Sequence, residues 1–274
     1  MPDETTTPPV ALSIAGSDSG GGAGVQADLK TFAALRVHGT CALTAVTAQN
    51  TREVRGVTVL EPARVRQQIE TVLDDFDVRG VKTGMLATAG IVAEVAALAA
   101  AGRLANLVVD PVLVSSTGHR LMEQAGIDAY VELLLPHTLV ITPNLREAAI
   151  LGGTTLDALG PVAARIAVAE RLRAAGARWA VVKGGHLADS ADDVVAGPDG
   201  VSVLPGVRVP TGNDHGTGCS LSAAVAAGLA CGVPVGEAIA QAKAFVARGL
   251  AGGAGWRLGG GHGPLDHFGW SSPS

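Results

Sequence analysis

The sequence predicts an α/β fold, in which a mostly parallel central sheet lies between two layers of helices. Short apolar runs alternate along the chain with segments of helical periodicity, and 47% of the 274 residues are hydrophobic, which is enough for one large core. No linker or internal repeat divides the sequence. We therefore expect a single domain over residues 10–274, after a disordered lead-in over residues 1–9 that contains three prolines.

The strands are predicted from apolar runs that end at glycine or polar residues. The first run, residues 10–15, is typical of a buried parallel strand, and it ends at Gly16. Similar runs follow at residues 40–47, 57–60, 80–84, 107–110, 138–142 and 179–183. Residues 194–196 and 201–209 are expected to form a more exposed antiparallel pair, because Pro198, Asp199 and Gly200 make a turn sequence between them.

Helices are predicted between most of these strands. After a glycine-rich loop over residues 17–24, Val25, Leu29 and Phe32 share one helical face. Pro62 is expected at the first position of a helix that ends near residue 73. Further helices are expected at residues 88–101, after Pro143, and at residues 161–175, 217–230 and 235–251. This alternation predicts right-handed crossovers, so that the carboxyl ends of the parallel strands meet at one edge of the sheet.

Composition and charge exclude several classes of protein. The formal net charge is −5 and the 20 Lys and Arg residues form no basic block, so nucleic acid is not an expected partner. No run of 18 apolar residues is present and the N-terminus is acidic and proline-rich, so we expect no membrane span and a cytoplasmic protein. The three cysteines, Cys41, Cys219 and Cys231, lie too far apart to indicate a disulfide framework or a zinc site.

Residues 213–220 indicate an anion-binding turn at the start of a helix. Gly216 and Gly218 flank Thr217, so the backbone can direct consecutive N–H groups at one point where the helix begins. Cys219 lies on the first helical turn, where the same field is expected to lower the pKa of a thiol. The alternative, a glycine-rich turn that only caps a helix, remains open on this stretch alone.

Other polar and glycine residues follow the expected strands and are therefore predicted to lie at the same edge of the sheet. Gly22 and Gly24 also fit a dinucleotide-binding fingerprint, but the second strand ends at Gln49 rather than at an acidic residue that would bind a ribose. Phosphoryl transfer fits better, since it needs an anion site, a cation, carboxylates for a metal and a proton acceptor. The candidates for these roles are residues 216–219, Lys183, Asp110 with Glu147, and Cys219.

Seven sequence motifs, several of which contain these candidate residues, carry a resemblance to a known family. They are AGSDSGGGAGVQADLKTF (15–32), TAVTAQN (44–50), KTGML (82–86), VDPV (109–112), TPNLRE (142–147), KGGH (183–186) and HGTGC (215–219). In this order they resemble the hydroxymethylpyrimidine/phosphomethylpyrimidine kinases of thiamine biosynthesis, in the ribokinase-like superfamily. Most sugar kinases of that superfamily have Asp where this family, like this chain, has Cys219. Asp214 departs from the family, which more often has Thr there, and a carboxylate at this place repels phosphate unless a cation offsets it.

The resemblance implies a ribokinase-like α/β/α sandwich that uses ATP and Mg²⁺ to phosphorylate 4-amino-5-hydroxymethyl-2-methylpyrimidine (HMP) and then its monophosphate. Asp28 and Gln49 would hydrogen-bond the aminopyrimidine. Gly16 and Ala23 would let the ring approach the backbone, and Met85 and Val112 would pack on its faces. Asp110 and Glu147 would serve Mg²⁺, while Asn144, Lys183 and Thr217 would contact the nucleotide, and Gly216, Thr217, Gly218, Cys219 and Lys183 would act in catalysis. A homodimer is also implied.

Some of these residues have simpler explanations. Asp28 could be a solvated helix charge, Glu147 could complement a helix dipole, and Asn144 is expected to cap a helix as well. His186, His215 and His267 are left out of catalysis, because a lone histidine usually makes a local hydrogen bond. Two other functions stay open: a pyridoxine or pyridoxal kinase, and a non-catalytic pyrimidine-binding protein.

Overall fold

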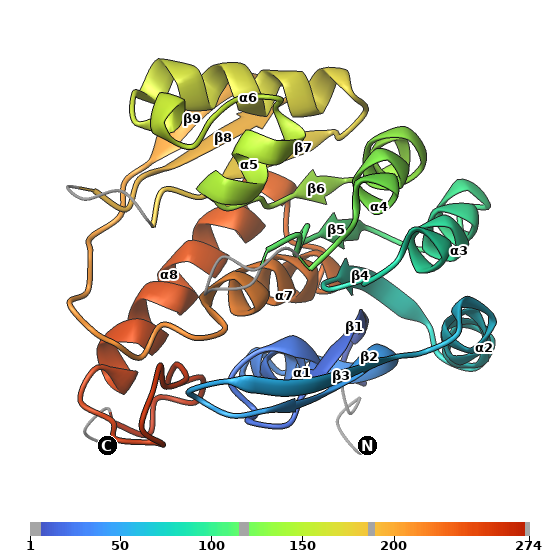
Figure 1. Ribbon diagram of the computed structural model, residues 1–274, viewed down its shortest axis with the longest axis horizontal. Coiled ribbons are helices and arrows are strands. Elements are labelled where there is room, and N and C mark those ends of the chain that lie inside the picture. Colours follow the sequence, from blue (N-terminus) through green and yellow to red (C-terminus); the bar gives the residue numbers. More distant parts are fainter. Residues whose placement is uncertain (1–6, 115–120, 186–189, 272–274) are drawn as a thin grey trace, which may run out of the picture.

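One nine-stranded sheet forms the centre of the computed structural model, which describes residues 7–114, 121–185 and 190–271. The strand order is β3-β2-β1-β4-β5-β6-β7-β8-β9, from the bottom to the top of Figure 1. The strands are β1 (Val10–Asp18), β2 (His38–Gln49), β3 (Val54–Val59), β4 (Val78–Thr83), β5 (Leu107–Val109), β6 (Val140–Ile141), β7 (Trp179–Val182), β8 (Asp193–Gly197) and β9 (Gly200–Leu204). Six neighbouring strands, β2, β1, β4, β5, β6 and β7, run parallel. Strands β3 and β8 run antiparallel to them, and β9 pairs antiparallel with β8.

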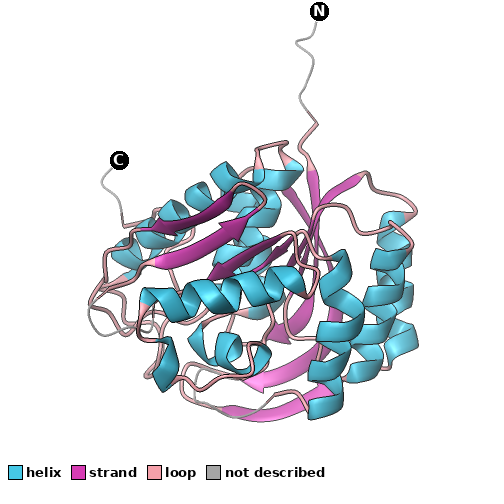
Figure 2. Cartoon of the chain, turned by 90° about the horizontal axis from the view of Figure 1, so that it is seen from above, coloured by secondary structure: helices cyan, strands magenta, loops and turns pink. Residues whose placement is uncertain are grey.

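Helices cover both faces of the sheet (Figure 2). One face is covered by α2 (Pro62–Leu73), α3 (Ala89–Ala100), α4 (Gln124–Ala129), α5 (Leu145–Leu151) and α6 (Val162–Ala174). The other face is covered by α1 (Gly24–Ala34), α7 (Thr217–Ala230) and α8 (Val235–Gly253). The predicted three-layer α/β/α sandwich with a mostly parallel sheet is therefore confirmed. No helix in the described part of the chain is long and apolar enough to cross a membrane.

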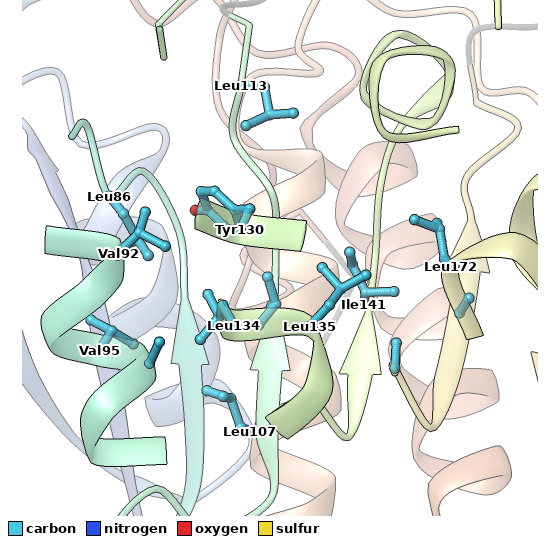
Figure 3. Close-up of a cluster of buried hydrophobic side chains, with 14 of the residues drawn as sticks. Leu86, Val92, Val95, Leu107, Leu113, Tyr130, Leu134, Leu135, Ile141 and Leu172 are labelled. Atoms are coloured by element: carbon cyan, nitrogen blue, oxygen red, sulfur yellow. The ribbon is translucent and has the colours of Figure 1, made fainter. Parts of the chain in front are cut away.

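Alternating strand residues belong to different apolar clusters, which explains why the strands read as continuous apolar runs. In β1, Leu12 and Ile14 join the cluster under α2 and α3, whereas Ala11 joins the cluster under α7 and α8. Figure 3 shows the first cluster, where Leu107 and Ile141 of the sheet lie beside side chains of the covering helices. Each such fully buried aliphatic side chain contributes about 1.5–3 kcal/mol to stability.

Three local features differ from the sequence prediction. Helix α4 and the helical turns that follow it were not predicted, although Ile127, Tyr130 and Leu134 have the spacing of one helical face and are buried. Strand β8 is buried throughout rather than exposed, because α6 packs on it. Strand β9 ends at Leu204 rather than at residue 209, since Pro205 has no N–H for the sheet. Residues 1–6 of the expected lead-in lie outside the described residues.

Candidate active site

The carboxyl ends of two parallel strands and the start of α7 bring a lysine, a carboxylate and two helix amides together. Asp110 follows β5 and Lys183 follows β7, and the Lys183 Nζ donates to Asp110 Oδ1 over 3.1 Å. A Cβ atom built on Gly218, in the first turn of α7, would lie 3.1 Å from the Lys183 Nζ. Burial would lower the pKa of Lys183, but the Asp110 and Glu147 carboxylates outweigh it and raise that pKa, so the lysine is a cation.

The first turn of α7 has amides that face no acceptor. The amides of Thr217 and Ser220 donate to the carbonyls of Asp214 and Gly216 over 3.3 and 2.8 Å. Within the described residues, those of Gly218 and Cys219 have no hydrogen-bond partner in the protein. Unpaired amides at a helix start attract anions, and here Lys183 adds a full positive charge. The geometry therefore suits the anion-binding interpretation of residues 216–219 better than a turn that only caps the helix.

Gly216 fixes the path of this turn. Its φ angle is +87°, in the left-handed region, and a Cβ atom there would overlap the carbonyl oxygen of Gly22 in the first glycine-rich loop. We expect Gly216→Ala to lower the free energy of unfolding by about 2 kcal/mol or more, because strain and overlap add. Urea denaturation measures this loss. Gly212→Ala is the control, since that position is open, and equal stabilities for the two variants would contradict the prediction.

Cys219 lies beside Gly24 and Lys82, and its thiol is not activated in this structure. Burial raises the pKa of the thiol to about 11; the Lys82 charge and a hydrogen bond from the Gly24 amide oppose this increase, and nearby carboxylates add to it. The expectation that the helix start lowers this pKa is therefore wrong. Removal from water outweighs the field of the helix.

Asp28 is completely buried and already has three hydrogen bonds. Its carboxylate accepts from the Lys82 Nζ, over 2.8 Å to each oxygen, and from the Ser13 hydroxyl over 2.6 Å. Burial would lower the pKa of Lys82, but Asp28 outweighs it and the pKa is raised. Asp28 is thus not a solvated helix charge, and each of its oxygens already accepts at least one hydrogen bond. It holds a buried lysine that the sequence prediction had left without a role.

Glu147 and Asn144 form a reciprocal cap at the start of α5. The Asn144 side chain accepts from the Glu147 amide over 3.0 Å, and Glu147 accepts from the Asn144 amide over 2.8 Å. Burial raises the pKa of Glu147 to about 8; Lys183 opposes the increase and Asp110 adds to it. Asn144 therefore caps the helix as expected, and Glu147 also binds a backbone amide at the helix start. In the described part of the chain, no group of three or more His, Cys, Asp or Glu side chains could hold a metal ion.

The residues expected around the ring lie on the β1, β2 and β4 side of the same edge. Gly16 and Met85 are adjacent, since a Cβ atom on Gly16 would lie 2.6 Å from the Met85 Cε. The Thr44 hydroxyl donates to the Met85 carbonyl over 2.6 Å and fixes this loop. Ala23 precedes α1, and Gln49 ends β2. Val112 lies two residues beyond Asp110, close to residues 115–120, which are not described, and His186 also lies outside the described residues.

Asp18 and His215 join the first glycine-rich loop to the turn before α7. The Asp18 carboxylate accepts from the amides of Gly20, Gly22 and Ala23, and the His215 Nε2 lies 3.0 Å from its Oδ2. Burial would raise the pKa of Asp18, but the hydrogen bonds from His215 and the amides lower it. Sequence reasoning missed both roles, although an aspartate directly before a glycine-rich loop is a recognisable turn signal.

The C-terminal tail, residues 254–271, holds the other side of the turn. The Asn213 side chain donates to the carbonyls of Gly253 and Trp256 over 2.7 and 2.9 Å, and the His215 amide donates to the Gly263 carbonyl. Asp214 pairs with His262 over 2.9 Å and is exposed. The Asp214 carboxylate that raised concern about phosphate is therefore bound to a histidine of the tail, whereas Lys183 pairs with Asp110.

His267 of the tail is buried against the first turn of α7. Its Nδ1 donates to the Leu265 carbonyl over 3.1 Å, so its Nε2 accepts from the Ser220 hydroxyl over 2.9 Å. Burial lowers the pKa of His267 to about 4, and the nearby Lys30 charge adds to the decrease. The imidazole is therefore neutral at pH 7.

We expect His267 to make the protein less stable in acid. Its pKa is lowered on folding, so the unfolded chain binds more protons, and the stability present above about pH 6.5 is lost as the pH falls toward 4. Between pH 7 and 4 the wild type should lose about 3 kcal/mol more than His267→Gln in urea denaturation. His137→Gln, at an exposed histidine, is the control. Parallel pH profiles for the wild type and His267→Gln would contradict this linkage.

Comparisons with known proteins agree with this geometry. The sequence profile of the phosphomethylpyrimidine kinase family matches residues 18–266. A hydroxymethylpyrimidine/phosphomethylpyrimidine kinase of Streptomyces coelicolor is 48% identical over 98% of this chain and 98% of its own length. Among solved structures, an ADP complex of Bacillus subtilis pyridoxal kinase has a TM-score of 0.86 and 38% identity over 95% of this chain and 98% of its own.

A pyridoxal kinase of Staphylococcus aureus, in complex with AMP-PCP and pyridoxal, has a TM-score of 0.86 and 32% identity over 97% of this chain and 96% of its own. These similarities extend over almost the whole chain, and they confirm the ribokinase-like sandwich that the seven motifs predicted. The chain belongs to the phosphomethylpyrimidine kinase family.

Proposed function

We propose that this protein transfers the γ-phosphoryl group of ATP to the hydroxymethyl group of HMP and then to the resulting monophosphate, in thiamine biosynthesis. The observation that supports this most directly is the meeting of Lys183 and Asp110 with the unpaired amides of Gly218 and Cys219. A cation and helix amides at one point are what a phosphoryl group in transfer needs. Gln49, Gly16 and Met85 would hold the ring beside it.

The nucleotide would bind along α7 and the carboxyl ends of β5 to β7. The S. aureus pyridoxal kinase was solved with the ATP analogue AMP-PCP, which supports ATP as the phosphoryl donor of this chain. Lys183, Thr217 and Asn144 are the proposed contacts to its phosphates.

Asp110 and Glu147 fit Mg²⁺, because burial and mutual repulsion raise the pKa of Glu147 to about 8, and a divalent cation relieves such repulsion. Mg²⁺, when bound, neutralises phosphate charge. Two carboxylates are too few to bind the ion alone, which suits a metal that also uses phosphate oxygens.

Cys219 is the proposed proton acceptor for the alcohol of HMP. Only the thiolate of Cys219 can accept this proton; Lys82 and the Gly24 amide favour the thiolate, although burial raises the pKa of the thiol to about 11. In the second step the nucleophile is a phosphate that is already ionised at neutral pH. The two steps therefore differ in their need for a base, although they share the anion site.

Two other functions remain as alternatives. Pyridoxal kinase activity is favoured by the likeness to two pyridoxal kinases, at 38% and 32% identity. A non-catalytic pyrimidine-binding protein would keep the ring site without transfer. ADP release from ATP and Mg²⁺, measured in parallel with HMP, HMP monophosphate and pyridoxal, separates all three. We expect release with the first two; release with pyridoxal alone, or tight HMP binding without release, would overturn the proposal.

We also propose a homodimer in the cytoplasm. The valines of β3, Val54, Val57 and Val59, are 41–51% exposed, which supports an apolar surface available to a second copy. Sedimentation equilibrium of the purified protein tests this, and a monomer at micromolar concentration would contradict it.

A further inference from the structure

The His215 imidazole lies between Asp18 and Gln49, at the edge of the proposed ring site. Its Nε2 is 3.0 Å from the Asp18 Oδ2 and 3.3 Å from the Gln49 Nε2. The ring has little freedom, because a Cβ atom on Gly22 would lie 2.5 Å from its Cδ2. The His215 amide is also anchored, to the Gly263 carbonyl over 3.1 Å. The imidazole is thus held against both neighbours at once.

The proton on this nitrogen decides which way the Gln49 amide faces. Asp18 is a carboxylate with a lowered pKa, so the His215 Nε2 must be protonated and donate to it. A protonated ring nitrogen has no lone pair, and it therefore cannot accept from the Gln49 NH₂ group. The proton on the His215 Nε2 therefore permits only one orientation of the Gln49 amide. In that orientation the amide oxygen faces His215, and the NH₂ group lies on the other side, near the Thr47 hydroxyl.

We propose that His215 is a positioning residue that fixes the orientation of the Gln49 amide and thereby favours an aminopyrimidine over a pyridine alcohol. The amide so oriented offers a second oxygen lone pair and an N–H side by side. An aminopyrimidine offers the matching pair, an exocyclic amino donor beside a ring nitrogen acceptor, whereas pyridoxal has a hydroxyl beside a methyl-bearing carbon. This inference rests on the proposed function only for the identity of the ligand.

Loss of the His215 imidazole should reduce the affinity for HMP more than the affinity for pyridoxal. When a polar group in a binding site loses its orientation, the ligand that uses both of its hydrogen bonds loses most affinity. Removing the imidazole should therefore weaken HMP strongly and pyridoxal little. A merely structural role of His215, as a support of the glycine-rich loop through Asp18, would instead weaken both ligands alike.

Calorimetric titration of HMP and pyridoxal tests this with His215→Leu and His215→Gln. We expect His215→Leu to raise the Kd of HMP about tenfold and that of pyridoxal less than threefold, with the KM for HMP rising and kcat within threefold of wild type. His215→Gln, whose amide can donate at the position of Nε2, should restore HMP binding to within threefold. The matched control is His262→Leu, which removes a second histidine paired with an aspartate, at 2.9 Å, from Asp214.

A double-mutant cycle with Gln49→Met shows whether His215 acts through Gln49. In the Gln49→Met background, His215→Leu should change HMP affinity less than threefold. The inference would be overturned if the two substitutions reduced HMP affinity by independent factors that multiply. It would also be overturned if His215→Leu reduced the affinities for HMP and pyridoxal equally. ¹⁵N spectra of histidine-labelled wild type should show the Nε2-protonated tautomer at His215, and the opposite tautomer would overturn it without any variant.

Failure of this inference can be distinguished from failure of the proposed function. A wild type that binds HMP but releases no ADP contradicts the kinase proposal, and the titrations still test His215. A wild type that phosphorylates HMP while His215→Leu binds it normally contradicts only the role of His215. Circular dichroism and urea denaturation confirm that each variant is folded before its affinity is compared.

Discussion

Cys219→Ala will slow phosphorylation of HMP about 100-fold or more, and it will leave phosphorylation of the monophosphate within about threefold of wild type. The alcohol must lose a proton as it attacks, and we propose that Cys219, the thiol at the start of α7, receives it. The monophosphate attacks through an ionised oxygen and needs no such group. The measurement is ADP release with each substrate at saturating ATP.

The pH dependence gives the same prediction an independent test. Because the pKa of the thiol is about 11, its ionised fraction rises about tenfold per pH unit between pH 6 and 9. The ratio of first-step to second-step rate should rise with pH in the wild type and become flat in Cys219→Ala. Cys231→Ala, at an exposed thiol just beyond α7, is the matched control. Equal losses in both steps would show that Cys219 is not the base.

Lys183→Met will lower kcat/KM about 100- to 1,000-fold for both HMP and its monophosphate, because in the proposed mechanism both steps transfer the same phosphoryl group past this cation. The loss includes a second effect: the Asp110 carboxylate loses its 3.1 Å partner, and phosphate must approach uncompensated negative charge. Initial rates at several ATP concentrations measure the change. A loss under tenfold would contradict the role of Lys183.

Lys243→Met provides a matched control for Lys183→Met. Lys243 also pairs with a largely buried aspartate, Asp193, over 2.7 Å, and its side chain is 17% exposed against 12% for Lys183. It lies on α8, and its partner Asp193 begins β8, which neighbours β7 in the sheet. We expect Lys243→Met to reduce stability, as Lys183→Met does, and to leave kcat/KM per folded molecule within threefold. The comparison separates loss of an ion pair from loss of the transferring cation.

The sheet and one side of the site could be predicted from sequence because they follow from local pattern. Asp110 and Lys183 stand directly after apolar runs, and parallel strands place such residues at one edge whatever else the fold does. The turn at Gly216 is equally local, since glycine there permits a positive φ. Helix α4 has a local signal as well, the helical spacing of Ile127, Tyr130 and Leu134, although it was not predicted.

The remaining features depend on contacts between distant parts of the chain. Asp28 meets Lys82 from 54 residues away, and His215 meets Asp18 from 197 residues away. Residues so far apart in the chain form no local sequence pattern from which either contact could be predicted. The thiol pKa of Cys219 likewise depends on how completely tertiary packing removes water, and local reasoning about a helix start gave the opposite direction.

The contacts of the tail link the turn before α7 to a segment for which we propose no reacting atom. Residues 213–215 are fastened through Gly253, Trp256 and Gly263, while Gly261 and His262 bind Thr51 at the β2–β3 hairpin. Amides of these three segments should therefore exchange with deuterium together, as one cooperative unit. Any event that frees the tail, such as carboxypeptidase trimming or a bulky fusion, would switch off the enzyme while its sheet stays folded.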